Sequence, residues 1–321
     1  MWGRTPIVYA ANISRELEID LYIKRDDLTG LALGGNKTRK LEFLLGDALR
    51  KNCDTVITAG AVHSNHALQT AAAAQKLGLE AVLVLRGVAE NKGNYFLDRL
   101  LDAEIRVYEA KTGGELQNYM EEIQRELLAG GKKPYLIPVG GSSPTGVLGY
   151  IKAAAEIMEQ GRELNLAWDY VVSATSSGGT QAGILLGLKT IAPAVKPLCI
   201  GVGDPREELL AAVQGLVQET AAMLELEGGV LTGAEIEGST IAGYGFGGYG
   251  TIVKEVIEVI RYVARKEGIY LDPVYTGKAF FGLLDLAKRK IIPPGSRVLF
   301  VHTGGVGGLF QYEDLVSGML P

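Results

Sequence analysis

The chain contains few residues of the kinds that crosslink a fold or bind a metal ion. Among its 321 residues, two are cysteines and three are histidines. Cys53 and Cys199 lie far apart and belong to no Cys-x-x-Cys spacing, which argues against disulfides and structural zinc. His63 and His66 could form a metal-binding pair, but carboxylates are lacking around them, so we predict no metal site.

Long apolar runs and basic stretches are also absent. No run approaches the ~20 apolar residues that a membrane-spanning helix needs, and the N-terminus has no apolar core typical of signal peptides. The formal net charge is −5 and no Arg/Lys stripe with interleaved aromatic residues occurs, which argues against nucleic acid as a partner. We therefore expect a cytoplasmic protein that binds a small molecule, and neither a membrane nor nucleic acid.

Common hydrolase and nucleotide motifs are missing as well. The sequence has no Gly-x-Ser-x-Gly elbow and no phosphate loop that ends in Gly-Lys-Ser/Thr. The stretch 243–248 matches Gly-x-Gly-x-x-Gly, but no clear strand precedes it, so dinucleotide binding is disfavoured.

Strand and helix signals alternate along the chain, which is 47% hydrophobic and 21% charged. This alternation predicts an α/β fold with parallel sheets covered by helices. A length of 321 residues exceeds the usual size of one hydrophobic core, so we expect two domains. The expected strands are 21–24, 54–58, 81–85, 104–108, 135–138, 168–174, 198–202 and 297–301.

Lys37 is the first candidate for chemistry. It follows Gly34 and Gly35 and stands where a loop becomes the helix expected at 41–50. The positive end of a helix disfavours an added cation, so the pKa of this lysine should fall and its amine should become a better nucleophile. A solvated surface lysine is the ordinary alternative.

Two loops between a strand and a helix supply further candidates. Ser64 and Asn65 precede a helix expected at 67–77, where they could be binding residues or a plain helix cap. Thr175–Thr180 precedes a helix at 181–189. Successive amides of small residues at a helix N-terminus suit a phosphate, although Gly-Ser turns are also common there. A nucleophilic lysine, a phosphate cradle and a polar loop together indicate a cofactor with an aldehyde and a phosphate, pyridoxal 5'-phosphate (PLP).

Ordered blocks of residues extend this pattern over nearly the whole chain. The blocks are Ile23–Gly30, Gly34–Lys40, Ser64–Asn65, Ala242–Gly245, Leu271–Ala279 and His302–Gly305. Together they resemble the family of 1-aminocyclopropane-1-carboxylate (ACC) deaminases and D-cysteine desulfhydrases. The resemblance implies the fold of type II PLP enzymes, in which the active site lies in the cleft between two doubly wound parallel-sheet domains. It also implies a homodimer. The larger domain would comprise 1–48 and 146–321, and the smaller inserted domain 49–145.

The resemblance also implies roles for individual residues. Lys37 would bond covalently to the cofactor aldehyde and act in catalysis. Lys40 and the amides of Ser177, Gly178, Gly179 and Thr180 would hold the phosphate, and Asn65 would bond to the ring hydroxyl. The residues that would bind the substrate are Ser64, Asn65, His66, Tyr244 and Tyr275. Of these, Ser64, Tyr244 and Tyr275 would also act in catalysis. Each tyrosine has an ordinary alternative, Tyr275 as a satisfied core aromatic and Tyr244 as a turn residue.

Two threonines bear on the reaction. The deaminases resemble Asp-Pro-Val-Tyr-Glu-Gly-Lys, with leucine in His-Thr-Gly-Gly, where this chain has Thr276 and Thr303. A carboxylate near the pyridine nitrogen deepens the electron sink that ring opening requires, whereas a neutral hydroxyl suffices when the β carbon carries a good leaving group. Thr276 and Thr303 therefore favour β elimination from D-cysteine, and either could contact that nitrogen. Ser-Asn-His, with His66, also resembles the desulfhydrases.

The segment Phe246–Tyr249 departs from the desulfhydrases, which resemble Gly-Tyr-Gly-Val-Pro-Asn-Asp there, so the substrate stays open. The alternatives are L-cysteate or another β-substituted amino acid, and ACC. A protein that binds PLP or an anion without catalysis is disfavoured, since it would not need the lysine, serine, asparagine and tyrosines together.

Overall fold

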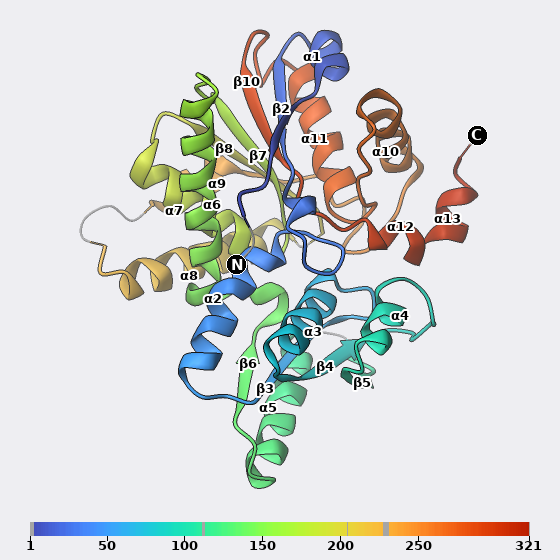
Figure 1. Ribbon diagram of the computed structural model, residues 1–321. Helices are drawn as coiled ribbons and strands as arrows, with labels where there is room; N and C mark the ends of the chain where they lie inside the picture. Colours follow the sequence, from blue (N-terminus) through green and yellow to red (C-terminus); the bar gives the residue numbers. More distant parts are fainter. Residues whose placement is uncertain (1–2, 111–112, 204, 227–230, 321) are drawn as a thin grey trace.

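The computed structural model describes residues 3–110, 113–203, 205–226 and 231–320. Two sheets form separate halves of the molecule, the larger above the smaller in Figure 1, and helices cover both of them. The expected α/β fold with helix-covered parallel sheets is confirmed.

The larger sheet has the strand order β1-β2-β10-β7-β8-β9, in which β1 runs antiparallel to β2 and the other neighbours are parallel. The smaller sheet has the order β5-β4-β3-β6 and is parallel throughout its described strands. The strands are β1 (Ile7–Tyr9), β2 (Asp20–Lys24), β3 (Thr55–Ala61), β4 (Glu80–Arg86), β5 (Glu104–Tyr108), β6 (Pro134–Ile137), β7 (Tyr170–Thr175), β8 (Lys196–Gly201), β9 (Thr240–Ile241) and β10 (Arg297–Val301).

Every strand expected from the sequence is present, with ends that differ by up to three residues, while β1 and β9 were not expected. The strands of the smaller sheet all fall within 49–145, which agrees with an inserted domain there, although the domain boundaries themselves stay a prediction. None of the helices in the described ranges is long and apolar enough to cross a membrane.

The helices are α1 (Ala11–Leu17), α2 (Lys37–Arg50), α3 (Asn65–Leu77), α4 (Gly93–Leu100), α5 (Gly113–Ala129), α6 (Pro144–Glu163), α7 (Gly179–Ile191), α8 (Arg206–Met223), α9 (Gly233–Ser239), α10 (Lys254–Glu267), α11 (Thr276–Lys288), α12 (Gly307–Gln311) and α13 (Glu313–Ser317). Three of them, α2, α3 and α7, begin earlier than the sequence suggested. Lys37, Asn65 and Gly179 are therefore the first residues of helices.

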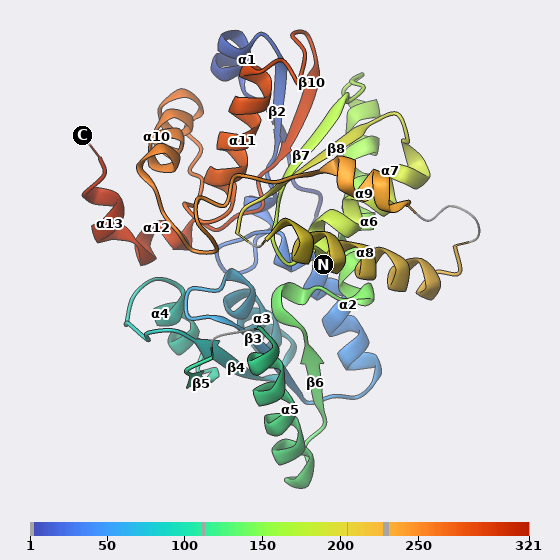
Figure 2. The ribbon, with the colours of Figure 1, turned by 180° about the vertical axis from the view of Figure 1, so that it is seen from behind.

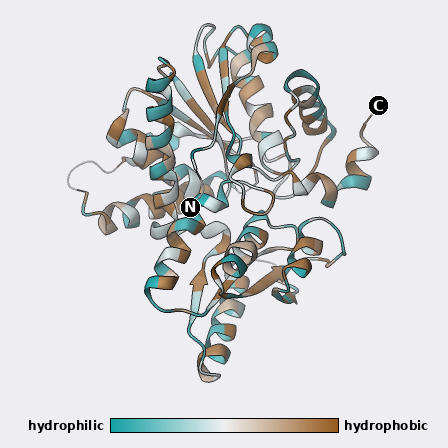
Figure 3. Cartoon of the chain, viewed as in Figure 1, coloured by the Kyte–Doolittle hydropathy of each residue, from teal (hydrophilic) through white to brown (hydrophobic). Residues whose placement is uncertain are grey.

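Helices cover both faces of each sheet. Because successive residues of a strand face opposite layers, each strand contributes side chains to two cores. In the larger sheet, Val172 and Phe300 share a core with residues of α10 and α11, whereas Val171 and Leu299 share one with α6 and α7. In the smaller sheet, α5 covers one face, and α2 and α3 cover the other (Figure 2). Figure 3 shows hydrophobic residues on the strands and on the helices that cover them.

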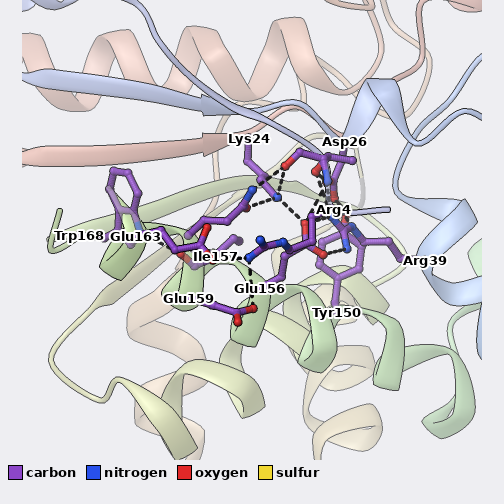
Figure 4. Close-up of polar contacts among 12 residues, drawn as sticks. Arg4, Lys24, Asp26, Arg39, Tyr150, Glu156, Ile157, Glu159, Glu163 and Trp168 are labelled. Carbon is purple, nitrogen blue, oxygen red and sulfur yellow. Dashed lines mark hydrogen bonds and ion pairs between the residues drawn. The ribbon is translucent and has the colours of Figure 1, made fainter. Parts of the chain in front are cut away.

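A buried ionic network fixes the start of α2 to the larger half (Figure 4). Arg39 donates to Asp26 at 2.7 Å and to Glu156 of α6 at 2.8 Å. Lys24, at the end of β2, donates to Glu156 at 2.5 Å, and the hydroxyl of Tyr150 donates to Asp26 at 2.7 Å. Arg39, the member of this network in α2, lies two residues after Lys37, so the network fixes the helical turn that carries the candidate nucleophile.

Candidate active site

A cavity of about 390 Å³ lies where the two halves meet, a volume within the range of small-molecule sites. We call it the active-site cavity. Its wall is formed by residues of both sheets and of α2, α3, α5, α7 and α8 with the loops beside them, and it includes most of the residues singled out in the sequence. Those on the wall are Lys37, Ser64, Asn65, His66, Ser177, Gly178, Thr180, Tyr275 and Thr303.

Lys37 is the first residue of α2 and its side chain reaches this cavity. Burial lowers the pKa of its amine to about 8, and the charge of Asp272 partly opposes that shift. Near neutral pH a sizeable fraction of this amine is therefore unprotonated, which is the form that attacks an aldehyde or accepts a proton.

Lys40 and Gly179 do not line the cavity but lie next to residues that do. The amine of Lys40 donates to the carbonyl of Gly140 at 3.0 Å and to the Ser142 hydroxyl at 3.4 Å. Burial, and then the charge of Lys37, lower the pKa of Lys40 well below its usual range. A Cβ on Gly179 would lie 2.8 Å from the Lys40 amine and 2.7 Å from the Ser142 hydroxyl, so a larger residue here would displace these two side chains.

The N-terminus of α7 lies at the cavity, where the sequence predicts a phosphate cradle. Gly178 has a φ of +79°, a conformation that favours glycine and turns the chain into the helix. The hydroxyl of Ser177 accepts from Ser142 at 2.9 Å, and that of Thr180 accepts from the Asn36 amide at 2.9 Å. These small residues leave the first amides of a helix of 13 residues beside the cavity, which suits a phosphate.

Ser64, Asn65 and His66 line the opposite side, at the start of α3. The Ser64 hydroxyl accepts from the Ala67 amide at 3.2 Å, so it caps the helix and also faces the cavity. The Asn65 carbonyl oxygen accepts from the Asn94 amide at 2.8 Å. The expected loop therefore presents two polar side chains and a helix N-terminus to the same space.

His66 is neutral and deeply buried. Burial, and then the charges of Lys37 and Lys40, lower its pKa well below the usual range. Its Nε2 bonds to the Thr58 hydroxyl at 2.8 Å, whereas the buried Nδ1 has no partner in the described structure. The Thr58 hydroxyl therefore fixes the ring beside the cavity wall.

The structure separates the two threonines. Thr303 lies on the cavity wall, and its carbonyl accepts from the Asn36 amide at 3.0 Å. Thr276 is fully buried, and its hydroxyl donates to the Asp272 carboxylate at 2.7 Å and accepts from the Asp272 amide at 2.8 Å. The expectation that Thr276 contacts a cofactor is therefore corrected, because its hydroxyl is used in closing the turn before α11.

The tyrosines also require a correction. Tyr275 lies on the wall, and its hydroxyl is 2.5 Å from that of Tyr249, which lines the cavity as well. Tyr244 lies outside the described wall, where its hydroxyl donates to Asp285 at 2.6 Å and its ring packs near Phe281. Tyr249, not Tyr244, is thus the second tyrosine at this site. A second Gly-Tyr-Gly, at 248–250, was the sequence signal that could have found it.

Lys278 holds the loop that carries Tyr249. Its fully buried amine donates to the carbonyls of Val202 at 3.1 Å, Gly245 at 2.8 Å and Gly248 at 3.1 Å. Burial lowers the pKa of this amine to about 8, with the charge of Asp272 opposing the shift. Three carbonyls bound to one ammonium fix a glycine-rich segment that has little side-chain packing of its own.

Comparison with known proteins agrees with this site. A family model described as "Pyridoxal-phosphate dependent enzyme" matches residues 1–304. A Pyrococcus abyssi protein named "Putative 1-aminocyclopropane-1-carboxylate deaminase" is 53% identical over 98% of this chain and 93% of its own. A Klebsiella pneumoniae protein named D-cysteine desulfhydrase is 42% identical over 96% of this chain and 94% of its own.

Solved structures give the same result. A crystal structure of "the ACC deaminase homologue" has a TM-score of 0.93 and 51% identity, and covers 99% of this chain and 94% of its own. Threonine deaminase isoform 2 from Solanum lycopersicum, at 20% identity, shares the fold with a TM-score of 0.71, over 99% of this chain and 83% of its own.

The chain belongs to the pyridoxal-phosphate dependent enzyme family, and the fold is that of its type II members. Within the family it is a PLP-dependent lyase of the group that includes the proteins named ACC deaminase and D-cysteine desulfhydrase. The residues present fit the cofactor. Lys37 offers an amine to the aldehyde, and the glycine turn before α7 offers amides to the phosphate.

Proposed function

We propose that the protein catalyses β elimination from D-cysteine, giving pyruvate, hydrogen sulfide and ammonia, and that it acts as a cytoplasmic homodimer. One observation carries the choice of reaction. The cavity presents the neutral hydroxyl of Thr303, and Glu208, an exposed residue, is the one carboxylate among the described residues of its wall. A cavity wall without a buried carboxylate suits a substrate whose electrons leave promptly with the β substituent.

The residues of the chain divide the work as follows. The N-terminus of α3, with Ser64 and Asn65, binds the substrate carboxylate and orients the α carbon toward Lys37. The Lys37 amine, with its pKa lowered to about 8, removes the α proton. Bound PLP supplies the electron sink for the charge that this step leaves on the α carbon.

The paired hydroxyls of Tyr249 and Tyr275 serve the leaving group. Burial raises the pKa of Tyr275 well above its usual range, so this hydroxyl keeps its proton and can donate a hydrogen bond to the departing sulfur. The Cα–H and Cβ–S bonds break, sulfide leaves with the electron pair, and water hydrolyses the released aminoacrylate to pyruvate and ammonia.

ACC ring opening is the second candidate, and the name of the Pyrococcus abyssi relative supports it. The test incubates the holoenzyme with D-cysteine, L-cysteine, L-cysteate and ACC and measures sulfide, sulfite and keto acid. Sulfide and pyruvate from D-cysteine support the proposal. Formation of 2-oxobutyrate from ACC, without sulfide from either cysteine, would contradict it.

A further inference from the structure

A second cavity of about 650 Å³ adjoins the active-site cavity. We call it the outer cavity. Three residues, Ala61, Arg86 and Tyr249, lie on the walls of both cavities, so they form the boundary between the two. Of these boundary residues, Arg86 carries a full charge, and the deduced reaction makes no use of it.

The fold places Arg86 beside the substrate-binding loop. It is the last residue of β4 and pairs with Ala61, the last residue of β3, while its carbonyl accepts from the Val62 amide at 3.0 Å. Neighbouring strands are ~4.8 Å apart, so Arg86 stands one strand away from the loop that leads to Ser64. Its position at the carboxyl end of a strand is where ligands bind in parallel sheets.

The charge of Arg86 acts on the interior of this region. His63, whose ring stacks on Tyr249 with centroids 5.9 Å apart, has its pKa lowered to about 4 by burial and then by the Arg86 charge. Lys92, the lysine of the outer cavity, is paired with Glu90 at 2.8 Å and lies 3.8 Å from Asp314. Arg86 is the cationic side chain that lies on the walls of both cavities.

The two ends of the active-site cavity have different tasks. Lys37 and the α7 N-terminus occupy the end that fits the cofactor, and the α3 N-terminus takes the substrate carboxylate. The remaining direction, toward Tyr249 and Arg86, is the one open to the substituent on the β carbon. A guanidinium presents a planar fork of donors that matches sulfonate, sulfate and phosphate oxygens.

We propose that Arg86 is a specificity-determining residue that binds an oxyanion on the β carbon, so that the substrate class includes β-sulfonated, β-sulfated and β-phosphorylated amino acids. This inference rests on the proposed β elimination. The Cβ–S or Cβ–O bond breaks, and sulfite, sulfate or phosphate leaves with the electron pair. The α proton goes to Lys37, and water hydrolyses the aminoacrylate as before, so no oxidant or further reactant is needed.

The test compares aspartate with asparagine, which have the same shape but differ in the charge on the β substituent, and neither has a leaving group. Their dissociation constants, for both enantiomers, are measured by calorimetry on the holoenzyme. A hydrogen bond between charged groups predicts that aspartate binds roughly 10- to 100-fold more tightly than asparagine. Arg86→Gln should reduce this ratio to about 1, Arg86→Lys should retain part of it, and Lys92→Gln, the matched control in the outer cavity, should leave it unchanged.

Turnover gives a second readout. The ratio of kcat/KM for cysteate to that for cysteine should fall in Arg86→Gln and stay constant in Lys92→Gln. An aspartate-to-asparagine ratio near 1 in the unmodified enzyme overturns the inference even if Arg86→Gln fails to fold, and so does a ratio that survives Arg86→Gln.

Failure of the inference and failure of the proposed function give different results. Sulfide release from D-cysteine without an aspartate preference removes the Arg86 subsite and leaves the elimination in place. An aspartate preference that depends on Arg86, in a protein that forms no keto acid from any β-substituted amino acid, supports the subsite and refutes the elimination.

Discussion

Replacing Glu156 by glutamine should destabilise the protein strongly. The Glu156 carboxylate lies 2.5 Å from the Lys24 amine and 2.8 Å from the Arg39 guanidinium, and these three side chains are 9%, 0% and 10% exposed. The substitution leaves two buried cations facing the single carboxylate of Asp26. Removing one partner of a buried ion pair costs about 3 to 5 kcal/mol, so the free energy of unfolding should fall by about that amount.

Glu159→Gln on the same helix is the matched control. Glu159 pairs with Arg4 at 3.3 Å, but these side chains are 57% and 47% exposed, so the loss should stay within about 1 kcal/mol. Guanidinium unfolding of both variants, followed by circular dichroism, measures the difference. Equal losses for the two variants would show that the network of Lys24, Arg39 and Glu156 does not hold α2 as described.

The same variant has a defined pH dependence. Burial raises the pKa of Glu156. Hydrogen bonds and charge from Arg39, and then from Lys24, lower this pKa by more than burial raises it, so the net shift is downward. A carboxylate with a lowered folded-state pKa adds stability above its unfolded pKa of about 4.3, and this stability is lost as the pH falls through the folded value. The gap between Glu156→Gln and the unmodified protein should therefore be full at pH 7 and shrink below about pH 4. A gap that stays constant to pH 2 would contradict the assigned charge state.

Three further predictions concern the site. Lys37→Ala should abolish turnover without unfolding the protein. In the unmodified protein without cofactor, the rate of PLP uptake should rise with pH to about 8 and level off above it, because the unprotonated Lys37 amine is the form that reacts. A flat pH profile would contradict this lowered pKa. Tyr249→Phe should reduce kcat by roughly 10- to 100-fold, the usual range for an acid–base group, while Tyr244→Phe should change it little. The reverse order would restore the original assignment. Thr303→Leu, which removes the hydroxyl of a residue on the cavity wall, should weaken sulfide release from D-cysteine, and an unchanged substrate profile would show that this position does not select the reaction.

Local patterns explain why so much of the site could be predicted. Lys37 follows two glycines, and the cradle before α7 is a run of small residues between a strand and a helix. Each of these features is determined within about ten residues of sequence, because strand ends, tight turns and helix starts are local events. The structure places both on one cavity wall, as expected.

Tyr244 shows where local patterns fail. Gly-Tyr-Gly occurs twice within eight residues, and nothing in either triplet says which tyrosine faces the cavity. That choice depends on two residues of α11. The Lys278 amine binds the carbonyls of Gly245 and Gly248, and Asp285 binds the Tyr244 hydroxyl. These partners lie more than 25 residues away.

The sequence analysis assigned Thr276 to the site and did not single out Arg86, and the two outcomes have related reasons. The hydroxyl of Thr276 is bonded to Asp272, a contact that a sequence block cannot distinguish from a contact with a cofactor. Arg86 reaches the site because β4 lies beside β3 in register, and strand order is not encoded in the residues near Arg86.

The attachment of the α2 start to the larger half has a consequence for how the enzyme cycles. Lys37 is fixed to the larger half, because Arg39 is bound to Asp26 and Glu156. Ser64 and Asn65 follow a strand of the smaller sheet. The later turns of α2 pack in the core of the smaller sheet, so this one helix joins the two sides between which the substrate would be held. Any change in the angle between the halves would therefore change the distance across that gap.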